Sequence, residues 1–210
     1  MKKLMFLVML FGLMIIGTDS ASAQGACKTA EPAAEEVFLY TDINFGGTCV
    51  SLKKFGRQSP NMANLPTIPN DSISSVKVGK NARALVCRDF DFKGDCTSLF
   101  GNDSNISHTV VGNDQISSIK VLQKRQMVQM TFTNQTGKTV KIYEQVGGVN
   151  SFLGTLDPNA GGIIYSDVMT TIVGMVDDRG IGGGFQLKNA SAKQINIDYA
   201  ANGPVQMTLR

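Results

Sequence analysis

The chain has 210 residues, with 20 Lys and Arg, 17 Asp and Glu, and a formal net charge of +3. That length accommodates one or two domains. The charge is small and scattered, which argues against a nucleic-acid partner, since such partners select a concentrated basic face. A single histidine and the lack of a recognisable nucleophile motif argue against an enzyme, so the sequence predicts no catalytic residues.

The N-terminus has the pattern of a secretory signal peptide. Two lysines precede the apolar run Leu4–Ile16, and an Ala-Ser-Ala sequence ending at Ala23 forms a small-x-small cleavage site. We therefore predict a signal peptide over residues 1–23, cleaved after Ala23, and an N-terminal arm over residues 24–36. The apolar run is too short for stable membrane insertion, so we expect a secreted or periplasmic protein.

Four cysteines follow the predicted cleavage site: Cys27, Cys49, Cys87 and Cys96. An even number in an exported chain predicts two disulfides, and four cysteines allow three pairings. Zinc binding is the weaker interpretation, because there is no CxxC pair and His108 is distant from the cysteines in sequence. Cys27 also allows a lipoprotein, although Gln24 stands where a lipobox has an aliphatic residue.

Two segments occur twice, in the same order. YTDINFGGTC at residues 40–49 is matched by CRDFDFKGDC at residues 87–96, and NDSISS at residues 70–75 by NDQISS at residues 113–118. A unit of about 40–45 residues is therefore repeated, from Val37 to Val78 and from Ala84 to Leu122.

Both repeats carry the local signals of β-structure. Apolar and polar residues alternate in Val76-Lys77-Val78 and in Ile119-Lys120-Val121, and Gly47 and Gly94 stand where a hairpin folds over. After the signal peptide, no part of the sequence has a sustained helical period. We predict an all-β fold in which two four-stranded units pack as a sandwich.

These motifs resemble the βγ-crystallin family. Tyr40-x4-Phe45-x-Gly47 is similar to its aromatic-x4-aromatic-x-glycine signature, and both Asn-Asp-x-Ile-Ser-Ser segments match its Ca²⁺-binding pattern. The resemblance covers residues 37–123 and implies a double Greek-key sandwich that binds two Ca²⁺ ions.

The resemblance also implies a ligand set for each ion. Site one would use the Asp71 side chain, the Ser72 carbonyl, the Ser74 hydroxyl and, from the other motif, the Phe90 carbonyl. Site two would use the Asp114 side chain, the Gln115 carbonyl, the Ser117 hydroxyl and the Ile43 carbonyl. These are hard oxygen donors, which Ca²⁺ prefers, and their low charge predicts a dissociation constant on the order of 10⁻⁵ to 10⁻³ M.

The second repeat departs from the family at one position. Cys87 stands where the family has an aromatic residue, so the stack of two rings is lost. A disulfide between Cys87 and Cys96 would replace that stack across the hairpin, which leaves Cys27 to pair with Cys49.

A plain turn is the alternative for each Asn-Asp-x-Ile-Ser-Ser segment. Asn and Asp tolerate left-handed backbone and bond to their own turns, so one copy alone favours a turn. Two copies at matched positions of a repeat favour metal binding.

Residues 126–210 contain no cysteine and form, on their pattern, a second small β-sandwich. The expected strands are Met127–Thr133, Val140–Tyr143, Ile163–Tyr165, Ile172–Val176, Phe185–Leu187, Ile195–Ile197 and Val205–Leu209. Residues 127–180 loosely resemble the β-domain of von Hippel–Lindau-type proteins, in the Asn-x-Thr-Gly turn before Val140 and the corner at Pro158. Fold alone carries no function, so the partner of this region stays open.

The sequence therefore predicts an exported Ca²⁺-binding protein with a structural or binding role, in which Ca²⁺ stabilises the fold or gates partner binding. A protein or surface polymer bound through the C-terminal domain is the expected partner besides the ion. The alternative is a secreted inhibitor or toxin-like effector that presents residues 61–69 as a rigid loop.

Overall fold

The computed structural model describes residues 27, 30–53, 67–146, 148–200 and 204–210. The predicted signal peptide lies outside these residues, as does most of the candidate loop 61–69. Within the described residues, no helix is long and apolar enough to cross a membrane. The regular structure consists of β-strands and short 3-10 turns, so the all-β prediction is confirmed.

We call residues 36–123 the N-terminal unit. Its strands are β1 (Glu36–Tyr40), β2 (Cys49–Lys53), β3 (Ser75–Val78), β4 (Ala82–Cys87), β5 (Cys96–Leu99) and β6 (Ser118–Gln123). Its 3-10 turns are η1 (Ile43–Phe45), η3 (Phe90–Phe92) and η4 (Ile106–His108).

The two repeats fold the same way. In each, the first two strands form an antiparallel hairpin, and the strand that follows the Asn-Asp-x-Ile-Ser-Ser segment pairs with the first strand, which gives the orders β2-β1-β3 and β5-β4-β6. Tyr40 is paired with Cys49 and Cys87 with Cys96, so the two motifs occupy matching positions in the two hairpins. Both repeats contribute to one apolar core, which includes Leu39 of β1 and, from the segments before β3 and β6, Ile73 and Ile116.

The hairpin turns depend on glycine. Gly47 and Gly94 have φ of +71° and +69°, a region that side chains rarely adopt. A Cβ on Gly47 would collide with Thr41, and one on Gly94 with the Asp89 carboxylate. The glycines of the two motifs are therefore required by the turn itself.

We call residues 127–209 the C-terminal unit. Its strands are β7 (Met127–Asn134), β8 (Val140–Val146), β9 (Val149–Leu156), β10 (Gly161–Asp167), β11 (Thr171–Val176), β12 (Arg179–Gly180), β13 (Phe185–Gln186), β14 (Lys193–Tyr199) and β15 (Val205–Leu209). Six of these contain a predicted strand in full, and β13 covers the first two residues of the predicted strand Phe185–Leu187. The sequence missed β9 because Val149–Leu156 has no clean alternation of buried and exposed residues.

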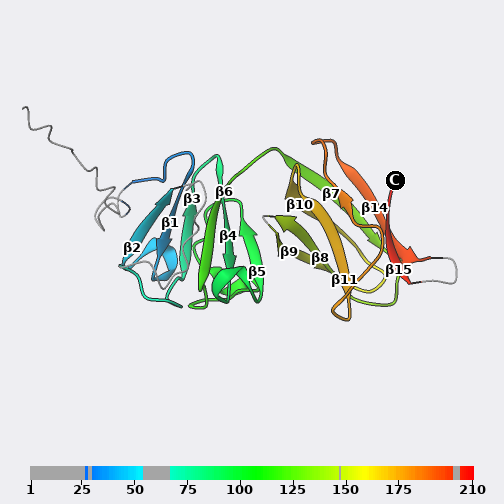
Figure 1. The fold of residues 1–210 in the computed structure, drawn as a ribbon, viewed down its shortest axis with the longest axis horizontal. Helices are drawn as coiled ribbons and strands as arrows, with labels where there is room; N and C mark the ends of the chain where they lie inside the picture. The colour runs from blue at the N-terminus through cyan, green and yellow to red at the C-terminus, as the bar shows by residue number, and fades with distance from the viewer. Residues whose placement is uncertain (1–26, 28–29, 54–66, 147, 201–203) are drawn as a thin grey trace, which may run out of the picture.

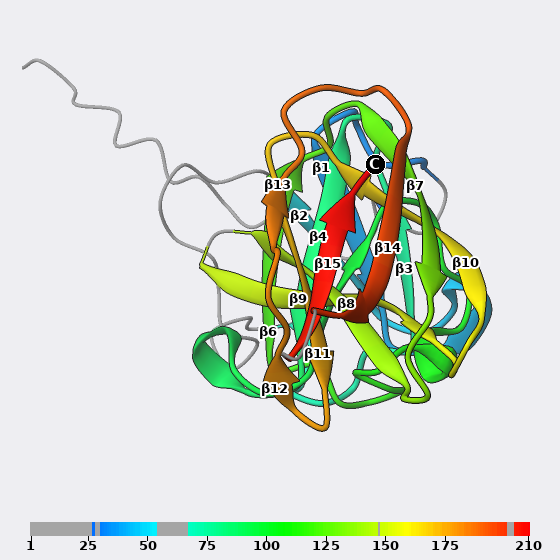
Figure 2. The ribbon, with the colours of Figure 1, turned by 90° about the vertical axis from the view of Figure 1, so that its right-hand side faces the viewer.

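A four-stranded sheet, β10-β7-β14-β15, packs against the sheet that contains β11, β8 and β9. The core between them is separate from that of the N-terminal unit and includes Phe132, Ile142 and Ile172. Figure 2 views this unit end-on, with β14 and β15 nearest the viewer. The predicted domain boundaries stay a prediction.

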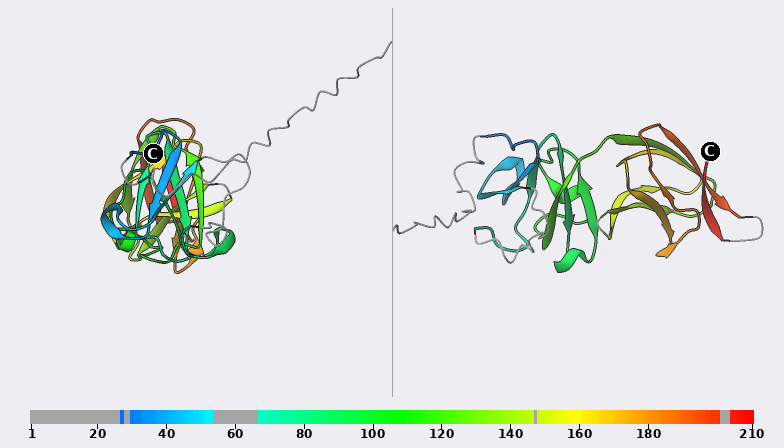
Figure 3. Two further views of the ribbon diagram at one scale, coloured as in Figure 1. Left: turned by 90° about the vertical axis from the view of Figure 1, so that its left-hand side faces the viewer. Right: turned by 45° about the horizontal axis from the view of Figure 1, so that its top comes forward.

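The two units lie side by side along the long axis of the molecule (Figure 1), and a tilted view gives the same arrangement (Figure 3). They share one sheet, because β9 pairs in parallel with β5 where Phe152 meets Thr97. The hydroxyl of Thr97 also donates to the Phe152 carbonyl, at 3.2 Å. The two units are therefore joined by a sheet that continues from β5 of one unit to β9 of the other.

Candidate metal centres

The two Asn-Asp-x-Ile-Ser-Ser segments lie next to each other. The Asp114 amide donates to the Ile73 carbonyl at 3.0 Å, which ties one segment to the other. Asp71 and Asp114 both have left-handed backbone, with φ of 53° and 52°. Asp tolerates this region better than most residues, so the turn interpretation is correct for the backbone of each segment. The question for metal binding is where the side chains lie.

The side chains pair across the repeat. The Ser117 hydroxyl donates to Asp71 Oδ1 at 2.8 Å, and the Ser74 hydroxyl donates to Asp114 Oδ1 at 2.9 Å. The hydrogen bonds join the carboxylate of one segment to the hydroxyl of the other, whereas the predicted ligand sets, which stay a prediction, combine the carboxylate and the hydroxyl of one segment. The physical reason is that each aspartate sits in a left-handed turn that reaches the other segment, whereas each serine is buried against its own hairpin.

Each of these serines is fixed by the first strand of its own repeat. The Ser74 amide donates to the Tyr40 carbonyl at 2.9 Å, and the Ser117 amide donates to the Cys87 carbonyl at 3.0 Å. The Ser74 hydroxyl is also within 2.7 Å of the Thr41 carbonyl. The two hydroxyls therefore occupy equivalent, well-determined positions.

The second serine of each segment has a different task, which the sequence analysis missed. The Ser75 hydroxyl donates to the Asp42 carbonyl at 2.6 Å and accepts from the Phe45 amide at 3.0 Å. Ser118 makes the same two bonds, to Asp89 and Phe92, at 2.7 and 3.1 Å. These serines hold η1 and η3 in place. The signal for this role in the sequence was that the second serine, like the first, is repeated in both segments.

The turns held in this way carry Ile43 and Phe90, whose side chains are exposed. The Ile43 carbonyl accepts from the Gly46 amide at 3.3 Å, and the Phe90 carbonyl accepts from the Lys93 amide at 3.4 Å. Both are long bonds, and a carbonyl oxygen has a second lone pair. Turn η1 packs on β3 and η3 on β6, so the predicted Ile43 carbonyl lies on the side of Ser74 and the Phe90 carbonyl on the side of Ser117.

Two asparagines give independent support for a cation or a water at these centres. The side-chain amide of Asn70 donates to Asp71 Oδ2, and that of Asn113 donates to Asp114 Oδ2, each at 2.8 Å. In both residues the Oδ1 atom is buried and has no hydrogen-bond partner within the described part of the chain. An unsatisfied buried acceptor costs about 1–3 kcal/mol, so this matched pair of oxygens fits a cation or a water as its partner.

The oxygen donors at each centre fit a hard cation, and the negative charge that they supply is low. Each centre offers one carboxylate and one hydroxyl, and the carbonyls of Ser72 and Gln115 directly follow the two aspartates. No group of three His, Cys, Asp or Glu side chains lies together in the described ranges, so carboxylates alone do not form a cage there. Oxygen ligands of this kind suit Ca²⁺, which accepts carbonyls and waters, better than Zn²⁺, which takes nitrogen and sulfur.

The disulfides pair Cys27 with Cys49 and Cys87 with Cys96, the pairing predicted from the resemblance. In the first repeat, the rings of Tyr40 and Phe45 meet edge to face, with centroids 5.7 Å apart. In the second repeat, the Cys87–Cys96 bond stands in place of that contact. Because the Cys87 carbonyl also holds the Ser117 amide, this disulfide lies directly beside one candidate centre.

No family model matches the chain. It is 38% identical over 100 residues to Spherulin-3A of Physarum polycephalum, a match that covers 45% of this chain and 91% of the relative. A solved structure described as "Evolution of the eye lens beta-gamma-crystallin domain fold" is 32% identical over 45% of this chain and 92% of its own, with a TM-score of 0.40. A βγ-crystallin domain of Abundant Perithecial Protein from Neurospora crassa, described as Ca²⁺-bound, is 20% identical over 45% and 94%, with a TM-score of 0.36. The resemblance of residues 127–180 to the von Hippel–Lindau β-domain stays a prediction.

Proposed function

The chain belongs to the βγ-crystallin family, and from that premise we propose that it is an exported protein that binds two Ca²⁺ ions between its two repeats. One ion is held by Asp71 and Ser117 and the other by Asp114 and Ser74, with the carbonyls of the Asn-Asp segments and of the hairpin turns as further ligands. The observation that carries the proposal is the crosswise pairing of these side chains beside the buried, unpartnered oxygens of Asn70 and Asn113.

The role of the ion is to stabilise the N-terminal unit. Neither repeat contains a complete ligand set, so an ion at either centre bridges the two repeats. Such an ion binds only the folded unit. At a free concentration a hundredfold above the dissociation constant, each site would add about 2.7 kcal/mol to the free energy of unfolding. One carboxylate per site suits an environment where Ca²⁺ is abundant, such as the outside of the cell.

A location outside the cytoplasm fits the rest of the chain. Both disulfides persist only in an oxidising environment, and the sequence begins with the pattern of a signal peptide. We therefore propose a structural or binding role, in which the C-terminal unit binds a protein or a surface polymer.

The test counts the sites and assigns their ligands. Calorimetric titration of Ca²⁺ into the chelator-stripped mature protein should find two ions, and Asp71→Ala or Ser117→Ala should each remove one. The double variant Asp71→Ala/Ser117→Ala should still bind one ion, because both changes affect the same centre. Asp71→Ala/Ser74→Ala should bind none.

Ser72→Ala is the matched control. Its hydroxyl donates to the Pro69 carbonyl, at 2.6 Å, and only its backbone carbonyl is a proposed ligand. This variant should keep both ions. If the wild-type protein takes up no Ca²⁺ and its melting temperature does not move, the two segments are plain turns and the proposed function is wrong.

A further inference from the structure

The four-stranded sheet of the C-terminal unit, β10-β7-β14-β15, has β10 at one edge and β15 at the other. In the end-on view of Figure 2, β10 forms the outer margin of this sheet, beyond β7. An edge strand presents a row of backbone N–H and C=O groups that can pair with another strand, so proteins usually protect it with a charge, a proline or a covering segment. The two edges of this sheet differ in that protection.

The β15 edge is covered by the chain itself. The Gly182 amide donates to the Val205 carbonyl at 3.1 Å, and the Met207 amide donates to the Gly182 carbonyl at 2.8 Å. A Cβ on Gly183, whose φ is +82°, would collide with the Met207 carbonyl, so this close approach requires glycine. Strand β15 is therefore already paired on its outer side at these residues.

Two hydrogen bonds show which backbone groups of β10 point toward β7. The Asn134 amide donates to the Ala160 carbonyl at 2.8 Å, just before β10 begins. The Val168 amide donates to the Gln126 carbonyl at 3.0 Å, just after β10 ends. Hydrogen-bonded positions alternate along an antiparallel pair, so the even-numbered residues of β10 bond to β7. The N–H and C=O groups of the odd-numbered residues therefore point away from β7.

Three exposed residues direct their backbone groups to this edge: Gly161, Ile163 and Tyr165. Among the strands that the structure describes, β10 pairs with β7 alone. Ile163 is 57% exposed and Tyr165 is 51% exposed, which is unusual for such large apolar side chains. The β10 edge is therefore both open and apolar.

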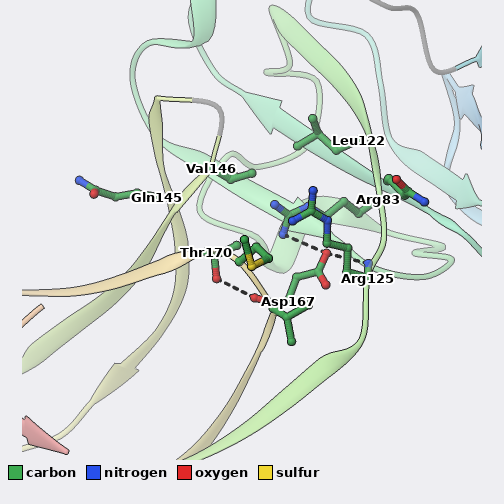
Figure 4. A pocket seen from close by; sticks show the side chains of 10 residues that line it. Arg83, Leu122, Arg125, Gln145, Val146, Asp167 and Thr170 are labelled. Carbon is green, nitrogen blue, oxygen red and sulfur yellow. Dashed lines mark hydrogen bonds and ion pairs between the residues drawn. The ribbon is translucent and has the colours of Figure 1, made fainter. Parts of the chain in front are cut away.

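The open stretch ends after Tyr165. Ser166 and Asp167 are buried at the joint with the N-terminal unit, where Asp167 lines a cavity of about 350 Å³ (Figure 4). The Asp167 carbonyl accepts from the Thr170 hydroxyl at 2.7 Å. The part of β10 that can receive another strand is therefore residues 161–165.

No charge protects this part of the edge. The sequences of β10 and β7 contain a single charged residue, the buried Asp167. Strand β10 also contains neither lysine nor proline, the residues that commonly keep an edge strand from pairing. Two copies of this strand would meet without repulsion between like charges.

The open stretch is complementary to itself. Two copies can pair antiparallel with their Ile163 residues opposite each other, which places each Tyr165 opposite the Gly161 of the other copy. All of these residues direct their backbone groups outward, so each pair can exchange two hydrogen bonds. The two isoleucines then pack together on the outer face, and each tyrosine ring covers a glycine that has no side chain of its own.

We propose that the protein forms a twofold-symmetric dimer through the β10 edge, in which the two four-stranded sheets join into one antiparallel sheet across the interface. The interface is isologous and the β15 edge of each copy is covered, so the joined sheet ends at two copies. The dimer uses none of the residues assigned to the metal centres and requires no Ca²⁺. Its test is therefore independent of the test of the proposed function.

Sedimentation equilibrium of the full mature protein measures the dimer in the presence of chelator. The wild-type protein should change from monomer to dimer at concentrations on the order of 1 μM to 1 mM. Ile163→Lys places a charge on the open edge and should raise the dimer dissociation constant roughly tenfold or more. Thr131→Lys is the matched control, because Thr131 is exposed on β7 and lies opposite Ile163 on the same face. This control should dimerise like the wild-type protein, and both variants should keep its melting temperature.

Ile163→Cys tests the register. Opposite residues in a hydrogen-bonded antiparallel pair have Cα atoms about 5.5 Å apart, which is within reach of a disulfide. This variant should form a covalent dimer on mild oxidation, as seen on a non-reducing gel. Thr131→Cys, which both β10 strands separate from its counterpart, should not.

A protein that stays monomeric across the concentration range contradicts the proposal, and so does a dimer that Ile163→Lys leaves intact. Equal loss of the dimer in Ile163→Lys and Thr131→Lys would mean that the outer faces of the sheets meet, and not their edges. Species larger than a dimer would overturn the proposal as well, because the covered β15 edge allows only two copies in the joined sheet.

Discussion

The substitution Glu144→Gln tests whether the joint between the two units rests on a desolvated ion pair. Glu144 is 0% exposed and Arg83 3% exposed. Each oxygen of Glu144 accepts from Arg83 and from one serine, so the amide nitrogen of a glutamine would face a guanidinium N–H in either orientation. Among the residues that the structure describes, the buried guanidinium would then keep only Asp167, at 3.9 Å, as a nearby counter-charge.

Removing one partner of a buried pair costs about 3–5 kcal/mol, because the other charge stays buried without compensation. In a protein of this size 1 kcal/mol moves the melting temperature by about 2–4 °C, so the expected loss is roughly 6–20 °C. Differential scanning calorimetry of the disulfide-intact protein measures it. Because the pair joins the two units, we also expect the single transition to separate into two.

Asp178→Asn is the matched control, since Asp178 pairs with Lys141 at 3.4 Å but is 88% exposed. It should melt at the same temperature as the wild-type protein, because exposed ion pairs contribute little to the free energy of unfolding. The variant Arg83→Met/Glu144→Leu/Asp167→Asn removes all three buried charges of the cluster and should recover more than half of the loss. If Glu144→Gln and Asp178→Asn melt at the same temperature, the pair is hydrated in solution and the reasoning fails.

Three further substitutions probe other parts of the structure. Burial raises the pKa of the Asp167 carboxyl, with Glu144 adding to the effect and the Arg125 amide and Arg83 opposing it, so the contribution of this group to stability is complete below its ordinary pKa of 3.8 and is lost as pH rises through the raised value. Urea unfolding should therefore show the wild-type protein losing stability relative to Asp167→Asn across that window, and a constant difference would contradict the assignment. Gly94→Ala places a Cβ 2.7 Å from the Asp89 carboxylate at a φ of +69° and should cost about 1–3 kcal/mol by thermal melting, whereas Gly101→Ala, with nothing within 4 Å, should cost far less. Cys87→Ser/Cys96→Ser should cost about 2–4 kcal/mol and weaken the Ca²⁺ site of Asp71 and Ser117 in calorimetric titration, whereas Cys27→Ser/Cys49→Ser should leave that site intact.

The sequence was sufficient for what depends on local pattern and repetition. The paired motifs predicted two equivalent hairpins, and the alternating runs predicted the third strand of each repeat. The loss of an aromatic residue at Cys87 predicted the cross-strand disulfide. These features follow from neighbours in the chain, from the period of two along a strand, and from the fixed reach of a disulfide.

What the sequence did not reveal depends on contacts between distant segments. The hydrogen bonds of Ser74 to Asp114 and of Ser117 to Asp71 require the relative placement of both repeats, which no single motif contains. The ion pair of Arg83 and Glu144 joins residues 61 positions apart. A signal for it was present, because the alternation in β8 places Glu144 on the same buried side as Val140 and Ile142, where a charge needs a partner.

The proposed metal centres and the ion pair at the joint lie in different parts of the molecule, so their effects can be separated. All the proposed Ca²⁺ ligands belong to the N-terminal unit, so binding would link its two repeats to each other. In the wild-type protein, we expect the joint to transmit that stabilisation to a single transition. In Glu144→Gln, where we expect two transitions, Ca²⁺ should raise only the one that belongs to the N-terminal unit. Calorimetry of this variant with and without Ca²⁺ decides the matter, and an equal shift of both transitions would mean that the units remain coupled through the β5–β9 edge alone.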